Sequence, residues 1–295
     1  MAAGLARQQR AYLYAMVAIA SWATIPTAFK LSLRHLGVLP LLFYASAVST
    51  IFLLVYVLSA GKLTLLKGFS KGDYLRSALL GFLNPFFYYA ILLNTYSLLP
   101  AQQAQPLNFV WPITLVLLSI PVLKQKIKAR SILAVFISFI GVIVISTEGR
   151  VLALRFTSPT GVGLALGSTI IWSLFWIYNV KLGMDEACQL SLSFVFGTAF
   201  VFLATLLFAE AEIPNYHGIA GAVYIGLFEM GLTFLCWLRA LKLAKTTAHV
   251  VNLIYLVPFL SLVVVRFVLG ERILLATVVG LVFIVGGIIL QKLWD

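Results

Sequence analysis

The chain has 295 residues, of which 62% are hydrophobic and 10% are charged, and its mean hydropathy is +1.05. A soluble domain carries charge on roughly a quarter of its residues, so this composition excludes an ordinary soluble protein. The formal net charge of +12 is no sign of nucleic-acid binding, because most of the 21 Lys and Arg residues fall in the loops of one side of the predicted helical arrangement.

Apolar segments along the chain predict an all-α polytopic membrane protein with ten transmembrane helices. Each segment is long enough to cross a hydrocarbon core of about 30 Å. The positive-inside rule places the N- and C-termini in the cytoplasm. The predicted helices cover, approximately, residues 12–32, 38–60, 74–95, 101–121, 130–147, 159–180, 188–209, 216–238, 247–268 and 273–292.

The sequence contains the same pattern twice. Residues 81–143 align with residues 227–289 without a gap, so that Pro112 corresponds to Pro258 and the Gln125-Lys126-Ile127 run to Glu271-Arg272-Ile273. Trp22 corresponds to Trp172 after a small change of register. We therefore expect two five-helix repeats, residues 1–150 and 151–295. Five is an odd number, so the second repeat would cross the membrane in the inverted sense, as in many secondary transporters.

Prolines interrupt several of the predicted helices. Pro26, Pro85, Pro112 and Pro258 lie within apolar spans, where each frees a carbonyl group and can kink the helix. Freed backbone groups are tolerated in lipid only where protein or a water-filled cavity satisfies them. The helices that carry these prolines are candidates to line a cavity; kinks needed only for packing are the alternative.

Aromatic and amide side chains near these prolines are the candidate substrate-binding groups. Trp111 precedes Pro112 in mid-membrane, where an indole N–H needs a partner. Asn84 and Tyr88 are four residues apart and are expected to share a helix face. Packing between helices is the alternative for each. The remaining candidates are Trp22, Asn108, Trp172 and Tyr255, with Trp176 and Trp237 as weaker ones and Gln102, Gln103 and Gln105 as the lining of an aqueous vestibule.

Glu229 is the carboxylate that lies deep within a predicted span. A charge at this depth is costly and marks either a proton-coupling site or a paired structural group. His249 near the start of a helix is better explained as an interfacial residue. Cys188 and Cys236 suggest neither a disulfide framework nor a metal site. No metalloprotease, nucleophile-elbow or P-loop motif occurs, so we expect no enzyme, no cofactor and no ATP drive.

The second copy ends in LVPFLSLVVVRFVLGERI (residues 256–273), followed by Gly280 and Gly286-Gly287. This pattern resembles the drug/metabolite transporter superfamily, EamA type. The run LNFVWPI (residues 107–113) and Met230-Gly231 are similar to the aromatic amino acid exporters of the YddG type. The resemblance implies ten helices in two inverted repeats, located in a bacterial inner membrane and exporting amino acids.

Aromatic walls with a few amides and hydroxyls, and little fixed charge, suit zwitterions with large apolar side chains. We therefore expect a secondary transporter that moves aromatic and other apolar amino acids by alternating access through a central cavity between the repeats. Its partners would be a small-molecule substrate and the lipid bilayer. A cationic drug or metabolite exporter that uses Glu229 and a channel are the alternatives. The oligomeric state is open, and a monomer is compatible with the sequence.

Overall fold

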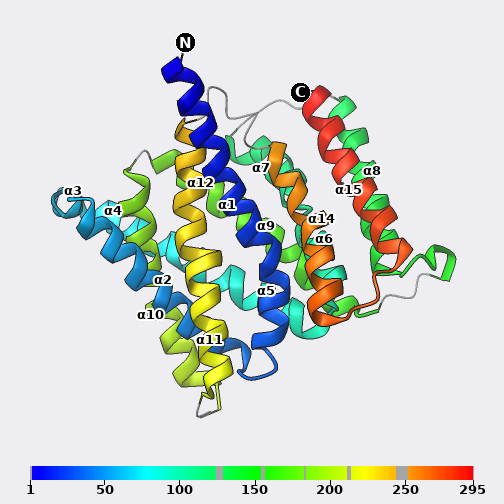
Figure 1. Cartoon of the computed structure of the whole chain (residues 1–295), viewed down its shortest axis with the longest axis horizontal. Helices are drawn as coiled ribbons and strands as arrows, with labels where there is room; N and C mark the ends of the chain where they lie inside the picture. Colours follow the sequence, from blue (N-terminus) through cyan, green and yellow to red (C-terminus); the bar gives the residue numbers. More distant parts are fainter. Residues whose placement is uncertain are drawn as a thin grey trace. The chain divides into compact units, whose positions relative to one another are not determined.

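The computed structural model describes residues 2–123, 129–153, 157–182, 184–210, 214–243 and 252–294, and every regular element in these ranges is a helix (Figure 1). The all-helical, multi-pass prediction is thus supported. Six helices are long and apolar enough to cross a membrane: Arg7–Ser32, Val38–Ser59, Lys71–Leu98, Pro159–Asn179, Ala187–Phe208 and Tyr216–Ala240. Shorter apolar helices cover Phe136–Ser146, Val257–Leu269 and Leu275–Leu290. The count of ten spans and the side on which the termini lie stay predictions.

The chain forms two compact units, and each unit takes helices from both halves of the sequence. Unit 1 comprises Met1–Phe87 and Gly183–Val264, and unit 2 comprises Tyr88–Leu182 and Val265–Asp295. The elements of unit 1 are α1 (Ala2–Ser32), α2 (Val38–Ser59), α3 (Leu63–Lys67), α4 (Lys71–Gly81), η1 (Phe82–Phe87), α10 (Glu186–Phe208), α11 (Tyr216–Ile225), η3 (Gly226–Gly231), α12 (Leu232–Leu243), η4 (Asn252–Leu256) and α14 (Val257–Val264). Those of unit 2 are α5 (Tyr88–Leu98), α6 (Ala101–Asn108), α7 (Trp111–Leu123), α8 (Ala129–Ser146), η2 (Val151–Ala153), α9 (Pro159–Leu182), η5 (Val265–Leu269) and α15 (Leu275–Trp294).

In unit 1, the central pair of helices is α2 and α10, and α1 packs against α12 and α14 (Figure 1). Thr50 of α2 and Thr198 of α10 share a hydrogen bond of 2.8 Å between their hydroxyl groups, and these residues are 148 positions apart. The sequence aligns with itself at offsets of 146 positions (residues 81–143 with 227–289) and 150 positions (Trp22 with Trp172), and 148 lies between them. This is the contact that the predicted repeats would place on a two-fold axis relating the two copies.

Unit 2 repeats this arrangement with α8 and α15, which run side by side, while α5 and α7 pack against α9 (Figure 1). The Ser138 hydroxyl donates to the carbonyl of Ile284 at 3.1 Å, and these residues are 146 positions apart. A Cβ atom at Gly141 would collide with the carbonyl oxygen of Gly280, so the two backbones touch. Close approach of small residues is a common way for membrane helices to associate.

Two of the long helices contain a wider, π-type turn. η1 interrupts the first copy and η3 interrupts the second copy at nearly the same aligned position. Within η1, Asn84 has φ −151° and ψ 122°, an extended backbone in the middle of a helical span. Turns of this kind are often found at functional sites. The proline pattern predicted a disturbance at η1, whereas nothing in the sequence predicted the one at η3.

The four prolines that were expected to kink helices have different surroundings. Pro85 lies within η1, next to the extended Asn84. Pro112 and Pro258 are the second residues of α7 and α14, where the missing N–H costs little because it would have no helical partner. α1 continues through Pro26 without a break. The first copy is thus interrupted before Pro112, between the end of α6 and the start of α7.

Candidate functional site

Three of the predicted substrate-binding residues meet in unit 2. Tyr88 comes from α5, Asn108 from the end of α6 and Trp172 from α9, and both α5 and α6 pack against α9. With their neighbours they form what we call the Tyr88 cluster: Tyr88, Tyr89, Asn108, Ser168, Trp172 and Trp176. Tyr88 and Trp172 are buried, with 4% and 8% of their surfaces exposed.

A chain of hydrogen bonds orders the polar side of this cluster. The Tyr88 hydroxyl donates to Asn108 Oδ1 at 3.4 Å. Asn108 Nδ2 donates to the Ser168 hydroxyl at 2.9 Å, which in turn donates to the carbonyl of Ala165 at 2.6 Å. Every donor in this chain has an acceptor, so the orientation of the Asn108 amide is set by its neighbours. Asn108 as a whole is half-buried.

Aromatic rings form the other side. The ring centroids of Tyr88 and Trp172 are 4.6 Å apart, and those of Tyr88 and Tyr89 are 4.8 Å apart. Trp176 meets Trp172 edge to face at 5.7 Å. Such pairs add rigidity beyond the area that they bury. The cluster therefore combines a rigid aromatic surface with an oriented amide, and its members carry no formal charge.

Trp111 lies beside this cluster in the same unit. It is the first residue of α7, and its carbonyl accepts a hydrogen bond of 3.2 Å from the Ser173 hydroxyl of α9. One turn further along, Thr114 and Thr169 share a hydrogen bond of 2.8 Å. These two bonds attach the start of α7 to the helix that carries Trp172. The Trp111 side chain is half-buried.

Unit 1 holds a second aromatic group around Trp22. The rings of Trp22 and Trp237 are 5.5 Å apart, so α1 meets α12 here as α9 meets α5 at Trp172 and Tyr88. Thr24 and Tyr224 share a hydrogen bond of 2.6 Å. Sequence reasoning did not name Tyr224 as a candidate. Its ring lies 4.8 Å from that of Phe228, and the four-residue spacing, which places both rings on one helix face, could have indicated this pair. Glu229 follows within η3 and is 7% exposed.

Asn84 is placed in unit 1 and is fully buried. Because its backbone is extended, the four-residue spacing to Tyr88 does not place the two side chains on one helical face. Tyr255 lies in η4, but its side chain is outside the described part of the chain, and His249 and the Gln125–Ile127 run are also outside the described residues.

The glutamines at the start of α6 do not line a vestibule, so that prediction was wrong. Gln102 and Gln103 are buried, and Gln102 binds the turn before α15 through the Arg272 carbonyl and the Leu274 N–H. Gln103 donates to Glu148 at 3.0 Å, and Gln105 accepts from Tyr96 at 2.7 Å. These amides serve the packing of unit 2.

The family assignment follows from a comparison with known sequences. The model of the EamA-like transporter family matches residues 9–147 and again residues 159–291. The chain belongs to the EamA-like transporter family. This outcome agrees with the resemblance of residues 256–273, and the two matches cover the two copies of the sequence pattern.

Individual relatives within this family are distant. An uncharacterized transporter of Clostridium kluyveri is 30% identical over 183 residues, which are 58% of this chain and 56% of that protein. The uncharacterized transporter YvbV of Bacillus subtilis is 26% identical over 221 residues, 74% of this chain and 70% of that protein. The match thus spans little more than half the length of the Clostridium protein. A crystal structure with a TM-score of 0.69 covers 96% of both chains at 18% identity and supports the fold alone.

Proposed function

We propose that this EamA-family protein is a secondary transporter that exports amino acids, aromatic and other apolar ones in particular, across a bacterial inner membrane by alternating access. One observation carries the proposal: the oriented amide of Asn108 lies at the edge of the Tyr88–Trp172 aromatic pair. A flat apolar side chain stacks on the rings, and a polar end group hydrogen-bonds to the amide. A ligand with a net charge would gain less, because no charged side chain belongs to the cluster.

The pattern of contacts supports two inverted five-helix repeats as the framework for alternating access. Thr50 meets Thr198 in unit 1, and Ser138 meets the Ile284 backbone in unit 2, each at its repeat-related position. Inverted repeats allow one arrangement to open toward either face of the membrane by exchanging the conformations of its two copies.

Counterflow in proteoliposomes tests this function. Vesicles preloaded with unlabelled phenylalanine should accumulate labelled phenylalanine or tryptophan from outside. Loss of a hydrogen bond or of the stacking surface should raise the half-saturation concentration about tenfold in Asn108→Ala and in Trp172→Ala. Thr169→Val is the matched control on the same helix, because it removes a hydroxyl that bonds Thr114 outside the cluster. Equal loss in Thr169→Val would indicate damage to α9 packing, and flux without counterflow would indicate a channel.

A cationic drug or metabolite exporter is the second candidate, and the burial of Glu229 within the π-type turn η3 favours it. A carboxylate in mid-span can bind a cation or a proton in turn. Under this alternative, the parent protein exports an organic cation and shows no amino acid counterflow, and Glu229→Gln abolishes the gradient-driven export. Unchanged driven export in folded Glu229→Gln protein would remove this candidate.

A further inference from the structure

Within unit 1, a line of buried polar side chains runs between α10 and the α4–η1 segment, which pack against each other. Gln189 and Ser193 lie one turn apart on α10, Ser77 lies one turn before Gly81 on α4, and Asn84 precedes Pro85 in η1. At most 1% of the surface of each of these four residues is exposed. We call this line the polar seam.

Glycines bring the two backbones together along the polar seam. A Cβ atom at Gly81 would collide with the carbonyl oxygen of Ser193, and one at Gly197 would collide with the ring of Pro85. The backbones thus touch at these two points, and the Cβ atom of Phe196 lies alongside Gly81.

Five side-chain atoms of the polar seam have no hydrogen-bond partner among the described residues: Ser77 Oγ, Asn84 Oδ1, Asn84 Nδ2, Gln189 Nε2 and Ser193 Oγ. Buried polar atoms are nearly always bonded to protein or to ordered water, since an unbonded one loses its solvation without compensation. Five such atoms along one interface indicate that the interface holds a ligand of its own.

The chemistry of these atoms identifies the ligand. The amide nitrogens of Asn84 and Gln189 are donors and require an acceptor, while Asn84 Oδ1 requires a donor and the hydroxyls accept either. A cation would satisfy only the oxygens, and no carboxylate belongs to the seam to balance its charge. Water both donates and accepts. We propose that a chain of buried water molecules occupies the polar seam and connects Asn84 to the aqueous surface at the Asp185 end of α10.

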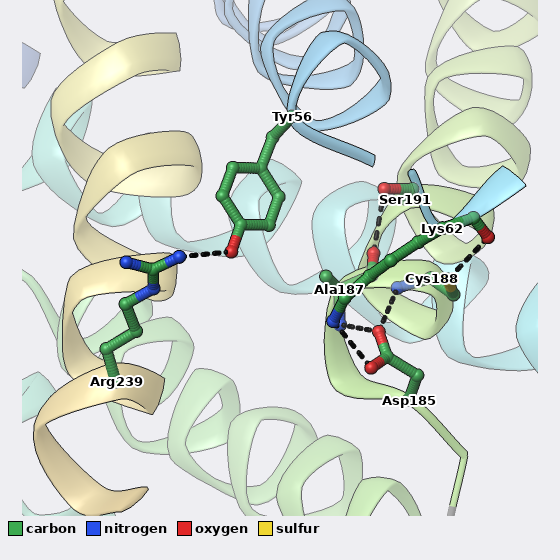
Figure 2. Close-up of polar contacts among 7 residues, drawn as sticks. All are labelled: Tyr56, Lys62, Asp185, Ala187, Cys188, Ser191 and Arg239. Carbon is green, nitrogen blue, oxygen red and sulfur yellow. Dashed lines mark hydrogen bonds and ion pairs between the residues drawn. The ribbon is translucent and has the colours of Figure 1, made fainter. Parts of the chain in front are cut away.

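The surface end of the seam is closed by an ion pair. Asp185 caps α10 one turn before Gln189, and its carboxylate accepts from Lys62 Nζ at 2.6 Å and from the N–H groups of Ala187 and Cys188 (Figure 2). The side chains of Lys62 and Asp185 are 30% and 23% exposed, so the pair lies where water can enter. Figure 2 also shows Arg239 bonded to the Tyr56 hydroxyl at 2.9 Å, which links α12 to α2 at a separate point.

A comparison position with the same backbone contact lies in the same unit. Ala45 on α2 is the counterpart of Ser193 at the register of the Thr50–Thr198 contact, which is 148 positions. A Cβ atom at Gly226 would collide with the Ala45 carbonyl, just as one at Gly81 would collide with that of Ser193. Ala45 and, one turn before it, Leu41 are apolar and buried, whereas Ser49, one turn after it, is a single buried hydroxyl without a partner among the described residues.

Thiol accessibility tests the proposal in full-length protein in proteoliposomes, with Cys188→Ala and Cys236→Ala as background. Hydrogen peroxide is little larger than water and oxidises a thiolate to a sulfenic acid with release of hydroxide, which a sulfenic-acid label then reports, and apolar burial suppresses thiolate formation. Ser193→Cys should therefore react at least about tenfold faster than Ala45→Cys, since one unit of pKa changes the thiolate fraction tenfold. Equal, slow rates at both positions would overturn the hydrated seam.

Two further variants define the route and guard against misfolding. Lys62→Met removes the ion pair and should accelerate labelling of Ser193→Cys but not of Ala45→Cys; an unchanged Ser193→Cys rate would overturn entry at the Asp185 end. If Ser193→Cys does not fold, Ser77→Cys on the opposite wall replaces it, with Ala222→Cys as its control. The proposal does not depend on the transported substrate, so it stands or falls separately from amino acid export.

Discussion

The α6 helix has its N-terminus capped by a side chain from the other half of the sequence, and removing that cap should destabilise unit 2. Glu271 Oε1 accepts from the N–H of Ala101 at 3.0 Å, and Oε2 accepts from the N–H of Gln102 at 3.1 Å. The N-cap residue of α6 is Pro100, whose side chain offers no acceptor. The Glu271 carboxylate thus satisfies two donors that would otherwise lack a helical partner.

The size of the effect follows from these two bonds. Loss of an ordinary N-cap costs about 0.5 to 2 kcal/mol, and a hydrogen bond to a charged group contributes about 1.5 to 3 kcal/mol. Glu271 is only half-buried, so water partly replaces the carboxylate when it is removed. We expect Glu271→Ala to lower the free energy of unfolding by about 2 to 3 kcal/mol. Glu271→Gln retains one acceptor oxygen and should lose about half of that amount.

Equilibrium unfolding in mixed micelles, followed by tryptophan fluorescence, measures these changes. Arg272→Ala is the matched control in the same turn, because Gln102 bonds only the backbone carbonyl of Arg272. This control should lie within about 0.5 kcal/mol of the parent, as surface substitutions usually do. If Glu271→Ala were no more destabilised than Arg272→Ala, the two bonds would make no net contribution, and the cap would be refuted as a stabilising feature.

Stability should also depend on pH through the Lys62–Asp185 ion pair. Burial, the largest single influence, raises the pKa of Asp185, but the Lys62 hydrogen bond, the Cys188 N–H and the Lys62 charge together hold that pKa below 3.8, its ordinary value. The hydrogen bond to Asp185 holds the pKa of Lys62 above its ordinary 10.5. The ion pair therefore contributes about 1 kcal/mol of stability at pH values between these two ordinary pKa values. This contribution is lost as the pH falls through the folded-state pKa of Asp185 or rises through that of Lys62. Asp185→Asn should flatten the acid side of a plot of melting temperature against pH, and an unchanged acid side would contradict this. In unit 2, Gly141→Ala should lower the free energy of unfolding by about 1 to 3 kcal/mol, because the new Cβ atom collides with the Gly280 backbone. Gly286→Ala on α15 is the control: its Cβ atom meets open space, so the variant should be neutral or stabilising in the same unfolding assay.

Much of the framework could be predicted because it depends on local signals. Hydropathy located the long spans. Sequence reasoning named Tyr88, Asn108 and Trp172 as separate candidates, since a buried phenol and a buried amide both need partners, but it paired Tyr88 with Asn84. These inferences use properties of single residues and of their spacing along one helix.

Other features depend on neighbours that are distant in sequence, and they could not be predicted. Gln102 appeared to be a cavity residue because it is polar at a helix start, but the backbone that it bonds lies about 170 positions away. The extended conformation of Asn84 has a local signal, because the residue before a proline favours an extended backbone, but the close approach of Gly197 of α10 to Pro85 has none. A π-type turn changes which face each later residue occupies, so one unpredicted turn invalidates every face assignment across it.

The two copies of this chain have kept their backbone contacts and changed the side chains around them. The close approach of Gly81 to Ser193 is repeated by that of Gly226 to Ala45, yet Gln189, one turn before Ser193, has the apolar Leu41 as its counterpart. Glu229 likewise has Leu83 as its counterpart in the aligned copies. A scaffold that only had to fold would have no reason to place a buried amide or carboxyl where the other copy has leucine, because each is costly in an apolar interior. The residues that differ between copies, more than those that are shared, are therefore where mutagenesis should look for transport chemistry.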